Sequence, residues 1–207
     1  MRLATAAIHV LECLTWQTRL AADGQLQELL QLSGIAVTSI RCLLGTLKAE
    51  GLVHRECIVA GILRLEQPIC RWQPGMRRQK LGPVAWKLIT RSRSLVRRRV
   101  MVNWATPAAA SLMGGTCGQL RQPLQAEHDL GTTATLIGCL RRNPDLIWIG
   151  EDIVRRRYAT SVRKVPDALI VNRDETIATA IEFGGQYSRR KLEAFRASWP
   201  KTPWEIW

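Results

Sequence analysis

The most constraining feature of this 207-residue chain is the order of apolar patterns between residues 124 and 207. Apolar residues at helical spacing over 124–142 are followed by three short apolar runs at 146–149, 165–171 and 177–183. A second helical pattern at 188–199 and a last run at 204–207 complete this half. Short apolar runs bounded by turn residues are typical of buried strands, whereas recurrence at every third or fourth position is typical of helices. This half therefore predicts the order helix, three strands, helix, strand.

The first 73 residues predict a different kind of unit. Apolar residues recur at helical spacing near 7–14, 26–32 and 37–50, and Gly51 stands where a helix C-cap is expected. The pattern then becomes that of an extended hairpin, over 52–59 and 62–72, with Ala60 and Gly61 at its tip. Three helices followed by a hairpin resemble the winged helix-turn-helix fold.

The third of these helices is similar to the recognition helix of many bacterial regulators. The resemblance implies that its exposed face enters the DNA major groove and that an arginine of the wing lies near phosphate. The residues implied for the groove are Thr38, Ser39, Arg41, Cys42 and Thr46, and those implied for the wing are Arg55 or Arg64. Because residues 1–66 carry no net charge and winged helices also bind proteins, a protein-interaction role stays open.

The charge of the chain is concentrated in its middle. Of a net charge of +13, residues 67–126 carry eleven basic side chains and contain no Asp or Glu. Such an imbalance indicates a polyanionic partner that supplies the missing negative charge. The basic residues are Arg71, Arg77, Arg78, Lys80, Lys87, Arg91, Arg93, Arg97, Arg98, Arg99 and Arg121.

We expect residues 74–123 to form a basic connector, with a helix over 84–104 and a loop over 105–118. Its arginines, Arg77, Arg78, Arg91, Arg93, Arg97, Arg98 and Arg99 among them, would contact the phosphate backbone. An alternative is that their long side chains cover apolar surface between the two halves. The predicted fold class is α+β with two domains, a winged helix at 1–73 and a mixed α/β unit at 124–207.

Three acidic residues lie at predicted strand ends in this C-terminal unit. Glu151 follows the first strand, Asp167 comes after Pro166 at the start of the second, and Glu182 ends the third. Carboxylates at neighbouring strand ends can converge on one hard cation that activates water. Glu151, Asp167 and Glu182 are therefore the candidate metal ligands, with Mg²⁺ or Mn²⁺ as the possible ion.

The C-terminal unit resembles the PD-(D/E)xK restriction-endonuclease core, which has the element order αβββαβ. The resemblance implies a lysine two residues after the third-strand acid, but Gly184 occupies that position. Lys191, on the following helix, is the candidate replacement. If the site is active, the candidate catalytic residues are Glu151, Asp167, Glu182, Gln186 and Lys191.

Both halves together resemble the replication-relaxation family of bacterial plasmids and other mobile elements. The stretches that carry the resemblance are Glu127-His128-Asp129-Leu130, Trp148-x-x-Glu151 and the segments 165–170 and 181–183. The resemblance implies a winged helix joined to a divergent nuclease-like domain, in a cytoplasmic, DNA-associated protein. The acid often found two residues after the third-strand Glu is Gly184 here, which argues against two-metal chemistry.

Three functions follow from these observations. The first is a non-catalytic binder of double-stranded DNA that acts in replication, transcription control or nucleoprotein assembly of a mobile element. The second is a metal-dependent DNA endonuclease, similar to the nuclease subunit of heteromeric transposases. The third is an adaptor that docks a partner protein of the element, and a homodimer is left open.

The cysteines and the apolar windows exclude other classes. Six scattered cysteines without a C-x-x-C pair predict reduced thiols rather than disulfides or a zinc site. We expect no membrane span, because no uninterrupted apolar window of about 18 residues occurs. The short apolar stretch at 3–10 is not expected to be a signal peptide.

Overall fold

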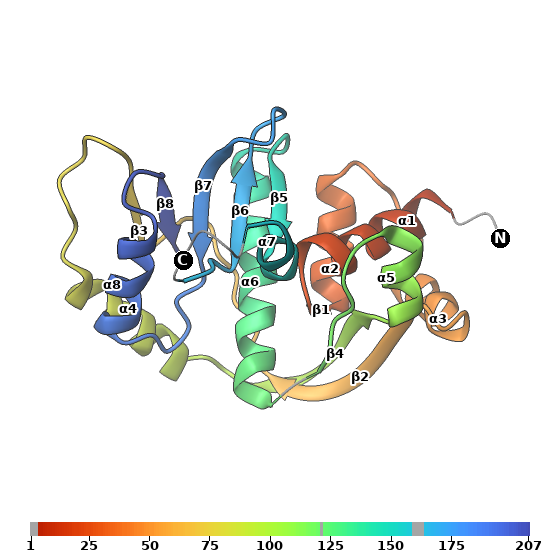
Figure 1. Cartoon of the computed structure of the whole chain (residues 1–207). Helices are drawn as coiled ribbons and strands as arrows, with labels where there is room; N and C mark the ends of the chain where they lie inside the picture. Colours follow the sequence, from red (N-terminus) through yellow and green to blue (C-terminus); the bar gives the residue numbers. More distant parts are fainter. Residues whose placement is uncertain (1–3, 121, 159–163) are drawn as a thin grey trace.

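The computed structural model describes residues 4–120, 122–158 and 164–207, which form a mixed α/β fold with two β-sheets (Figure 1). The helices are α1 (Thr5–Glu12), the π-helix η1 (Cys13–Gln17), α2 (Asp23–Leu32), α3 (Ile40–Ala49), α4 (Leu81–Arg93), α5 (Pro107–Met113), α6 (Pro123–Arg142), α7 (Glu151–Tyr158) and α8 (Arg189–Ser198). The strands are β1 (Ala21–Ala22), β2 (Val53–Ala60), β3 (Cys70–Trp72), β4 (Arg98–Ala105), β5 (Ile147–Gly150), β6 (Ala168–Val171), β7 (Ile177–Glu182) and β8 (Trp204–Ile206). None of the described helices is long and apolar enough to cross a membrane.

Three of the helices form where the N-terminal pattern predicts them. Helix α3 begins after Ser39, whose hydroxyl accepts a hydrogen bond from the Cys42 backbone N–H at 3.3 Å and so caps the helix. Its apolar side chains Ile40, Leu44 and Leu47 are buried. Gly51, at φ 70°, turns the chain out of the helix in the left-handed region that favours glycine.

The predicted hairpin after α3 is wrong. Strand β2 pairs along its whole length with β4, antiparallel, from Val53 opposite Ala105 to Ala60 opposite Arg98. Residues 62–69 form no strand, and β3 joins the other sheet by pairing with β8. Pro68 lies in that segment and has no N–H to donate to a strand ladder, which disfavours a return along β2.

The predicted connector also divides differently. One helix was expected over 84–104, but α4 ends at Arg93 and the β-branched residues Val100 and Val102 lie in β4. The expected loop over 105–118 contains α5, whose first residue is Pro107. The hydroxyl of Thr106 accepts from the Ala109 N–H at 3.2 Å, so this helix has both a capping residue and a first-turn proline.

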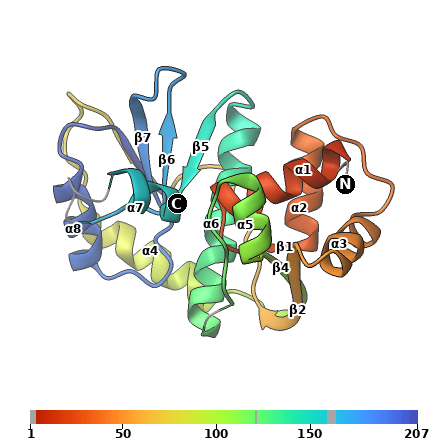
Figure 2. The same cartoon turned by 45° about the vertical axis from the view of Figure 1, so that its right-hand side comes forward.

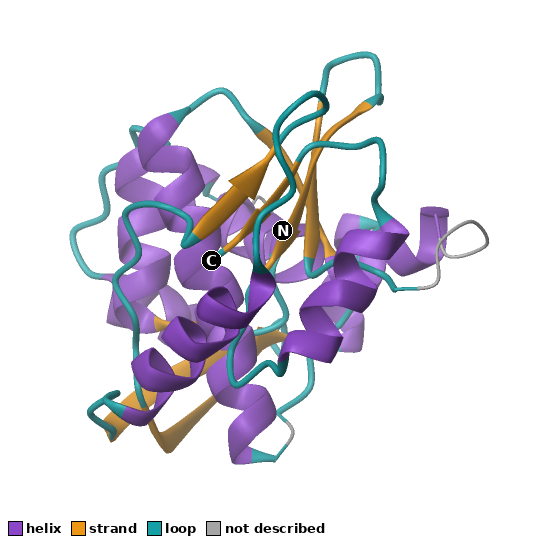
Figure 3. Ribbon diagram, turned by 90° about the vertical axis from the view of Figure 1, so that its left-hand side faces the viewer, coloured by secondary structure: helices purple, strands orange, loops and turns teal. Residues whose placement is uncertain are grey.

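The predicted element order of the C-terminal half is confirmed, with α7 as an addition between the first two strands. The sheet order is β3-β8-β7-β6-β5, antiparallel between β5, β6 and β7 and parallel between β7 and β8. Side chains alternate between the faces of the sheet. Leu169 and Ala180 pack toward α4, α7 and α8, whereas Ala168 and Ile181 pack toward α6, and the strands lie between helices (Figure 3).

Helix α6 joins the two sheets. It runs through the middle of the molecule, with the small sheet β1-β4-β2 beside one part and the larger sheet beside another (Figure 1). The Thr133 hydroxyl donates to the Leu20 carbonyl at 2.7 Å, and the Gln25 amide donates to the Leu130 carbonyl at 2.9 Å. One core cluster contains Leu44 of α3 and Ile181 of β7 together. The predicted units at 1–73 and 124–207 therefore share a core.

Candidate functional site

A groove of about 800 Å³ lies against α6 and the ends of β5 and β7. It is lined by four of the five candidate catalytic residues, Glu151, Asp167, Gln186 and Lys191. The fifth, Glu182, has no exposed surface and lies next to Asp167. The pairing of Ala168 with Ile181 explains this, because it places the residue before β6 and the last residue of β7 at the same end of the sheet.

Glu182 is neutralised from an unexpected direction. The ammonium group of Lys164 contacts its Oε1 atom, while Oε2 is buried without a hydrogen-bond partner among the described residues. Burial and the nearby Asp167 carboxylate raise the pKa of Glu182 to about 8, an effect that Lys164 only partly offsets. Glu182 therefore keeps its proton to a higher pH than an ordinary glutamate does.

Asp167 is the ionised member of the carboxylate pair. Its Oδ2 accepts from the Phe183 N–H at 2.7 Å and lies 3.4 Å from His128 Nε2. Burial alone would raise its pKa, but the charge and hydrogen bond of His128, then Lys164 and the Phe183 amide, lower it.

His128 carries the matching positive charge. Burial alone would lower the pKa of His128, but Asp167 and Asp129 together raise it well above the usual value. The Asp129 carboxylate lies 3.7 Å from Nδ1, and the ring stacks on Tyr187 with centroids 6.0 Å apart. The Tyr187 hydroxyl lies 3.3 Å from Nε2. His128 and Asp167 thus form a buried ion pair.

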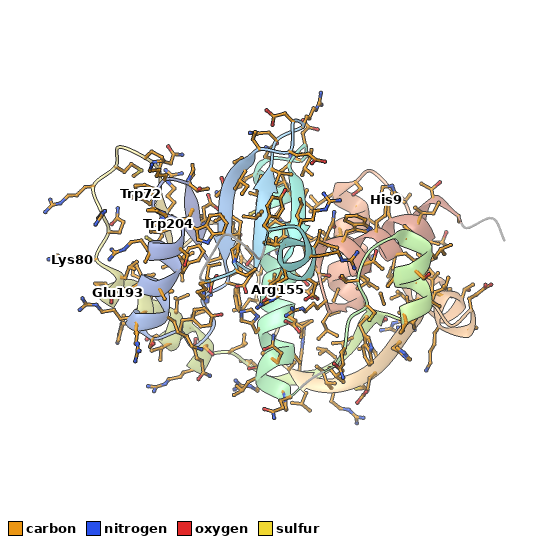
Figure 4. The ribbon with its side chains drawn as sticks, viewed as in Figure 1. His9, Trp72, Lys80, Arg155, Glu193 and Trp204 are labelled. Atoms are coloured by element: carbon orange, nitrogen blue, oxygen red, sulfur yellow. The ribbon has the colours of Figure 1, made fainter. Side chains whose placement is uncertain are left out.

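Glu151 lies at the start of α7 and has cations of its own. Arg19 approaches its Oε2 at 2.8 Å, and Arg155, labelled near the middle of Figure 4, contacts Oε1. Arg19 also pairs with Asp152, and the hydrogen bond that it donates to that carboxylate is the main cause of the raised pKa of Arg19. The structure therefore brings Asp167 and Glu182 together and holds Glu151 in a separate ion-pair network.

A side chain at the position expected for the lysine would clash with Leu88 unless Leu88 moved. A Cβ atom on Gly184 would lie 2.3 Å from a methyl group of Leu88, because α4 packs directly against this segment. The candidate replacement, Lys191, places its ammonium group 4.7 Å from the centre of the Tyr187 ring. Lys164, which precedes the Pro-Asp pair by two residues, contacts Glu182 instead.

These arrangements do not fit a divalent ion held by Glu151, Asp167 and Glu182. Each carboxylate already has a cationic side chain beside it, and burial raises the pKa of Glu182. Among residues 4–120, 122–158 and 164–207, no three His, Cys, Asp or Glu side chains form a group suited to a metal. Charge repulsion between Asp167 and Glu182 is relieved by Lys164, His128 and protonation.

The sequence reasoning missed His128, Lys164, Arg19 and Tyr187 as members of this cluster. His128 was noted only as part of the stretch Glu127-His128-Asp129-Leu130. Lys164 had one usable signal, its position just before the Pro-Asp pair, but a lysine was sought only after the third strand. Arg19 had none, because more than a hundred residues separate it from its partners Glu151 and Asp152.

Of the five residues implied for the major groove, four are exposed and one is half-buried. Thr38, Arg41, Cys42 and Thr46 are exposed, whereas Ser39 is half-buried and caps the helix. Arg55, expected near phosphate, instead donates to Asp23 at 2.7 Å and to Asn103 at 2.9 Å, with its side chain 13% exposed. The alternative residue, Arg64, is exposed.

Most basic residues of the middle segment are free to meet a ligand. Arg97 is not, because it forms a two-point ion pair with Glu127 at 2.6 and 2.9 Å. Arg91 donates to the Trp207 carbonyl at 2.8 Å, and burial lowers its pKa to about 10, so it serves packing. Arg121 lies outside the described residues. Eight others are exposed and form no ion pair within the described part of the chain: Arg71, Arg77, Arg78, Lys80, Lys87, Arg93, Arg98 and Arg99.

Comparison with known proteins adds no relative to this description. No protein-family model, no curated protein and no solved structure matches the chain.

Proposed function

We propose that the protein binds double-stranded DNA and does not cleave it. The observation that carries the proposal is the set of eight exposed basic side chains of residues 71–99 that have no anionic partner within the described chain. A folded protein normally places opposite charges near one another on its surface, since like charges repel. The phosphate backbone of DNA is the polyanion that such a surface attracts.

The exposed face of α3 supports duplex DNA as the ligand. A helix fits the major groove of B-form DNA, whereas the major groove of A-form RNA is too deep and narrow for side chains to read. Arg41 and Thr46 offer hydrogen-bonding groups on that face, and Thr38 lies just before the helix. We therefore assign base recognition to α3 and phosphate contacts with the same duplex to Arg93, Arg98 and Arg99 of the basic segment.

The buried cluster favours binding over catalysis. Lys164, His128 and Arg19 each balance a carboxylate, so the core is electrically satisfied without an added ion. The C-terminal unit then acts as a support for the DNA-binding surfaces. A factor for replication, transcription control or nucleoprotein assembly of a bacterial mobile element is the cellular role that we propose.

Two measurements test the proposal. Fluorescence anisotropy with a labelled random duplex should show binding that weakens steeply between about 50 and 200 mM salt, as expected for several phosphate contacts. Incubation with supercoiled plasmid in Mg²⁺ or Mn²⁺ should leave the plasmid intact. Absence of duplex binding at low salt would overturn the binding proposal, and nicking abolished by Asp167→Ala would replace it with the endonuclease alternative.

A further inference from the structure

Five of the eight exposed basic side chains gather in one place away from α3. A trough of about 710 Å³ is formed by β3, the loop 73–80 and the first half of α4. Its lining contains five cationic side chains and no acidic one: Arg71, Arg77, Arg78, Lys80 and Lys87. In Figure 4 Lys80 projects from the outer edge of the molecule.

The trough is held in shape by contacts with the rest of the fold. Trp72 stacks on Trp204, with centroids 6.0 Å apart, and its indole N–H donates to the Met76 carbonyl at 3.0 Å. Arg196 of α8 donates to the Gln79 carbonyl at 3.3 Å. These bonds fix the loop at two points and present its cations together before any ligand binds.

Trp86 stands beside the trough on the exposed side of α4. Its side chain is 68% exposed, the largest exposure of any described tryptophan, while Leu81, Val84, Ala85 and Leu88 form the buried face. It lies one helical turn from Pro83, which lines the trough, and two turns from the unpaired Arg93. No ring or cation contact of the Trp86 indole occurs within the described residues.

The trough and α3 are separate surfaces. In Figures 1 and 2 the loop before α4 and α4 itself lie toward one end of the molecule, and α3 lies at the other. Helix α6 and both sheets occupy the space between them. A ligand in the trough is therefore recognised independently of the duplex that α3 contacts.

We propose that the trough binds single-stranded nucleic acid, with phosphates along its five cations and one unpaired base stacked on Trp86. This inference rests on the proposed function and adds a second ligand class to it. In a duplex the base faces are covered by neighbouring pairs, whereas an unpaired base offers its face to an aromatic side chain. Cations combined with an exposed indole are the features that single-strand binding requires.

The test compares a labelled oligothymidine with a labelled duplex, by anisotropy, for the full chain. Trp86→Ala should weaken oligothymidine binding about tenfold and leave duplex affinity within about twofold, because loss of one stacked base has roughly that effect. Trp86→Phe should retain most of the affinity. Leu112→Ala on α5, which removes another exposed apolar side chain (57% exposed), is the matched control and should change neither.

The cations are tested separately. The double variant Arg77→Ala, Arg78→Ala should reduce the salt slope of oligothymidine binding by about 1.4, at about 0.7 for each phosphate contact on a single strand. Unchanged oligothymidine binding by Trp86→Ala would overturn the inference. The inference would also be overturned if polyglutamate displaced oligothymidine equally well from the wild type and from Trp86→Ala. That result would identify the trough as a site for an acidic protein.

The two proposals fail in distinguishable ways. If duplex binding is normal and Trp86→Ala does not change oligothymidine binding, the single-strand site is refuted and the proposed function stands. If the protein does not bind duplex DNA but its oligothymidine binding depends on Trp86, the proposed function is refuted and the single-strand site stands. Circular dichroism of each variant confirms folding, which substitutions of exposed side chains should not disturb.

Discussion

The ammonium group of Lys164 lies against the carboxylate of Glu182, a side chain with no exposed surface at the end of β7. The lysine precedes β6 and supplies a positive charge to the place where the sequence pattern predicted a metal ion. A lysine at position 184, where the family pattern has one, would clash with the side chain of Leu88. The pair therefore decides how the buried acids are balanced.

Removal of Lys164 should show how much this cation stabilises the buried carboxyl groups of Asp167 and Glu182. Lys164→Met should lower the free energy of unfolding, because it removes the cation that contacts the buried carboxyl group of Glu182. The wild-type melting temperature should not respond to Mn²⁺. The variant should gain a response worth about 2.7 kcal/mol at a hundredfold excess of ion over its dissociation constant. Differential scanning fluorimetry measures both.

The double variant Lys164→Met, Glu182→Gln is the control, because it removes both charges. It should recover much of the lost stability and show no response to Mn²⁺. A wild-type protein that is stabilised by Mn²⁺, with the effect lost in Asp167→Ala, would show that the carboxylates bind an ion despite Lys164.

Stability should fall as the pH rises through the neutral range. The folded-state pKa of His128 is raised above its unfolded value of about 6.5, so its contribution is complete below that pH and is lost as the pH rises through the folded pKa. The pKa of Glu182 is raised from 4.5 to about 8, so its contribution is likewise lost as the pH rises across that window. The lowered pKa of Asp167 acts only at the acid end, where stability is lost as the pH falls.

Urea unfolding between pH 6 and pH 8.5 measures this dependence. Each group should contribute a slope of at most about 1.4 kcal/mol per pH unit. His128→Gln and Glu182→Gln should each flatten the curve, whereas His9→Gln, at an exposed histidine, should not. A wild-type stability that rises over the same range would contradict the assignment of protons in the cluster.

Neighbouring arginines of β4 should differ in their effect on DNA binding. The double variant Arg98→Ala, Arg99→Ala should reduce the salt slope of duplex binding by about 1.8, at about 0.9 per phosphate contact. Arg97→Ala should change it little, since Arg97 already pairs with Glu127. Equal reductions from Arg97→Ala and from either neighbour alone would mean that the Glu127 pair opens on DNA.

Arg41 and Arg55 should separate base reading from folding. Arg41→Ala, on the exposed face of α3, should reduce the preference for a selected binding site by about 1–3 kcal/mol and affect random DNA less. Arg55→Ala should instead lower the melting temperature, because it removes the hydrogen bonds that Arg55 donates to Asp23 Oδ2 and Asn103 Oδ1. Equal losses of specific and random binding in Arg41→Ala would argue against base reading by α3.

The sequence predicts those parts of the fold that depend on local patterns. The apolar runs of β5, β6 and β7 and the helical spacing in α6 and α8 each lie within one segment, so their order could be predicted. The partner of β2 could not, because Ala60 and Arg98 meet across a long excursion of the chain. Pairing between distant strands depends on the packing of the whole molecule.

The candidate site was predictable to the same extent. Asp167 and Glu182 were found because the antiparallel pairing of β6 and β7 follows from a tight turn between them. Lys164 and His128 come from a loop and from α6, and only the folded arrangement shows that they face the acids. The packing of Leu88 against Gly184 was likewise invisible, since α4 precedes β7 by more than eighty residues.

The pairing of β2 with β4 has a mechanical consequence. The chain leaves the small sheet at Ala60, contributes β3 and α4 to the larger one, and returns at Arg98. The chain therefore crosses twice between the two sheets, once after β2 and once before β4. The two sheets therefore cannot separate as rigid bodies unless the β2–β4 ladder breaks or β3 and α4 leave their places against the larger sheet.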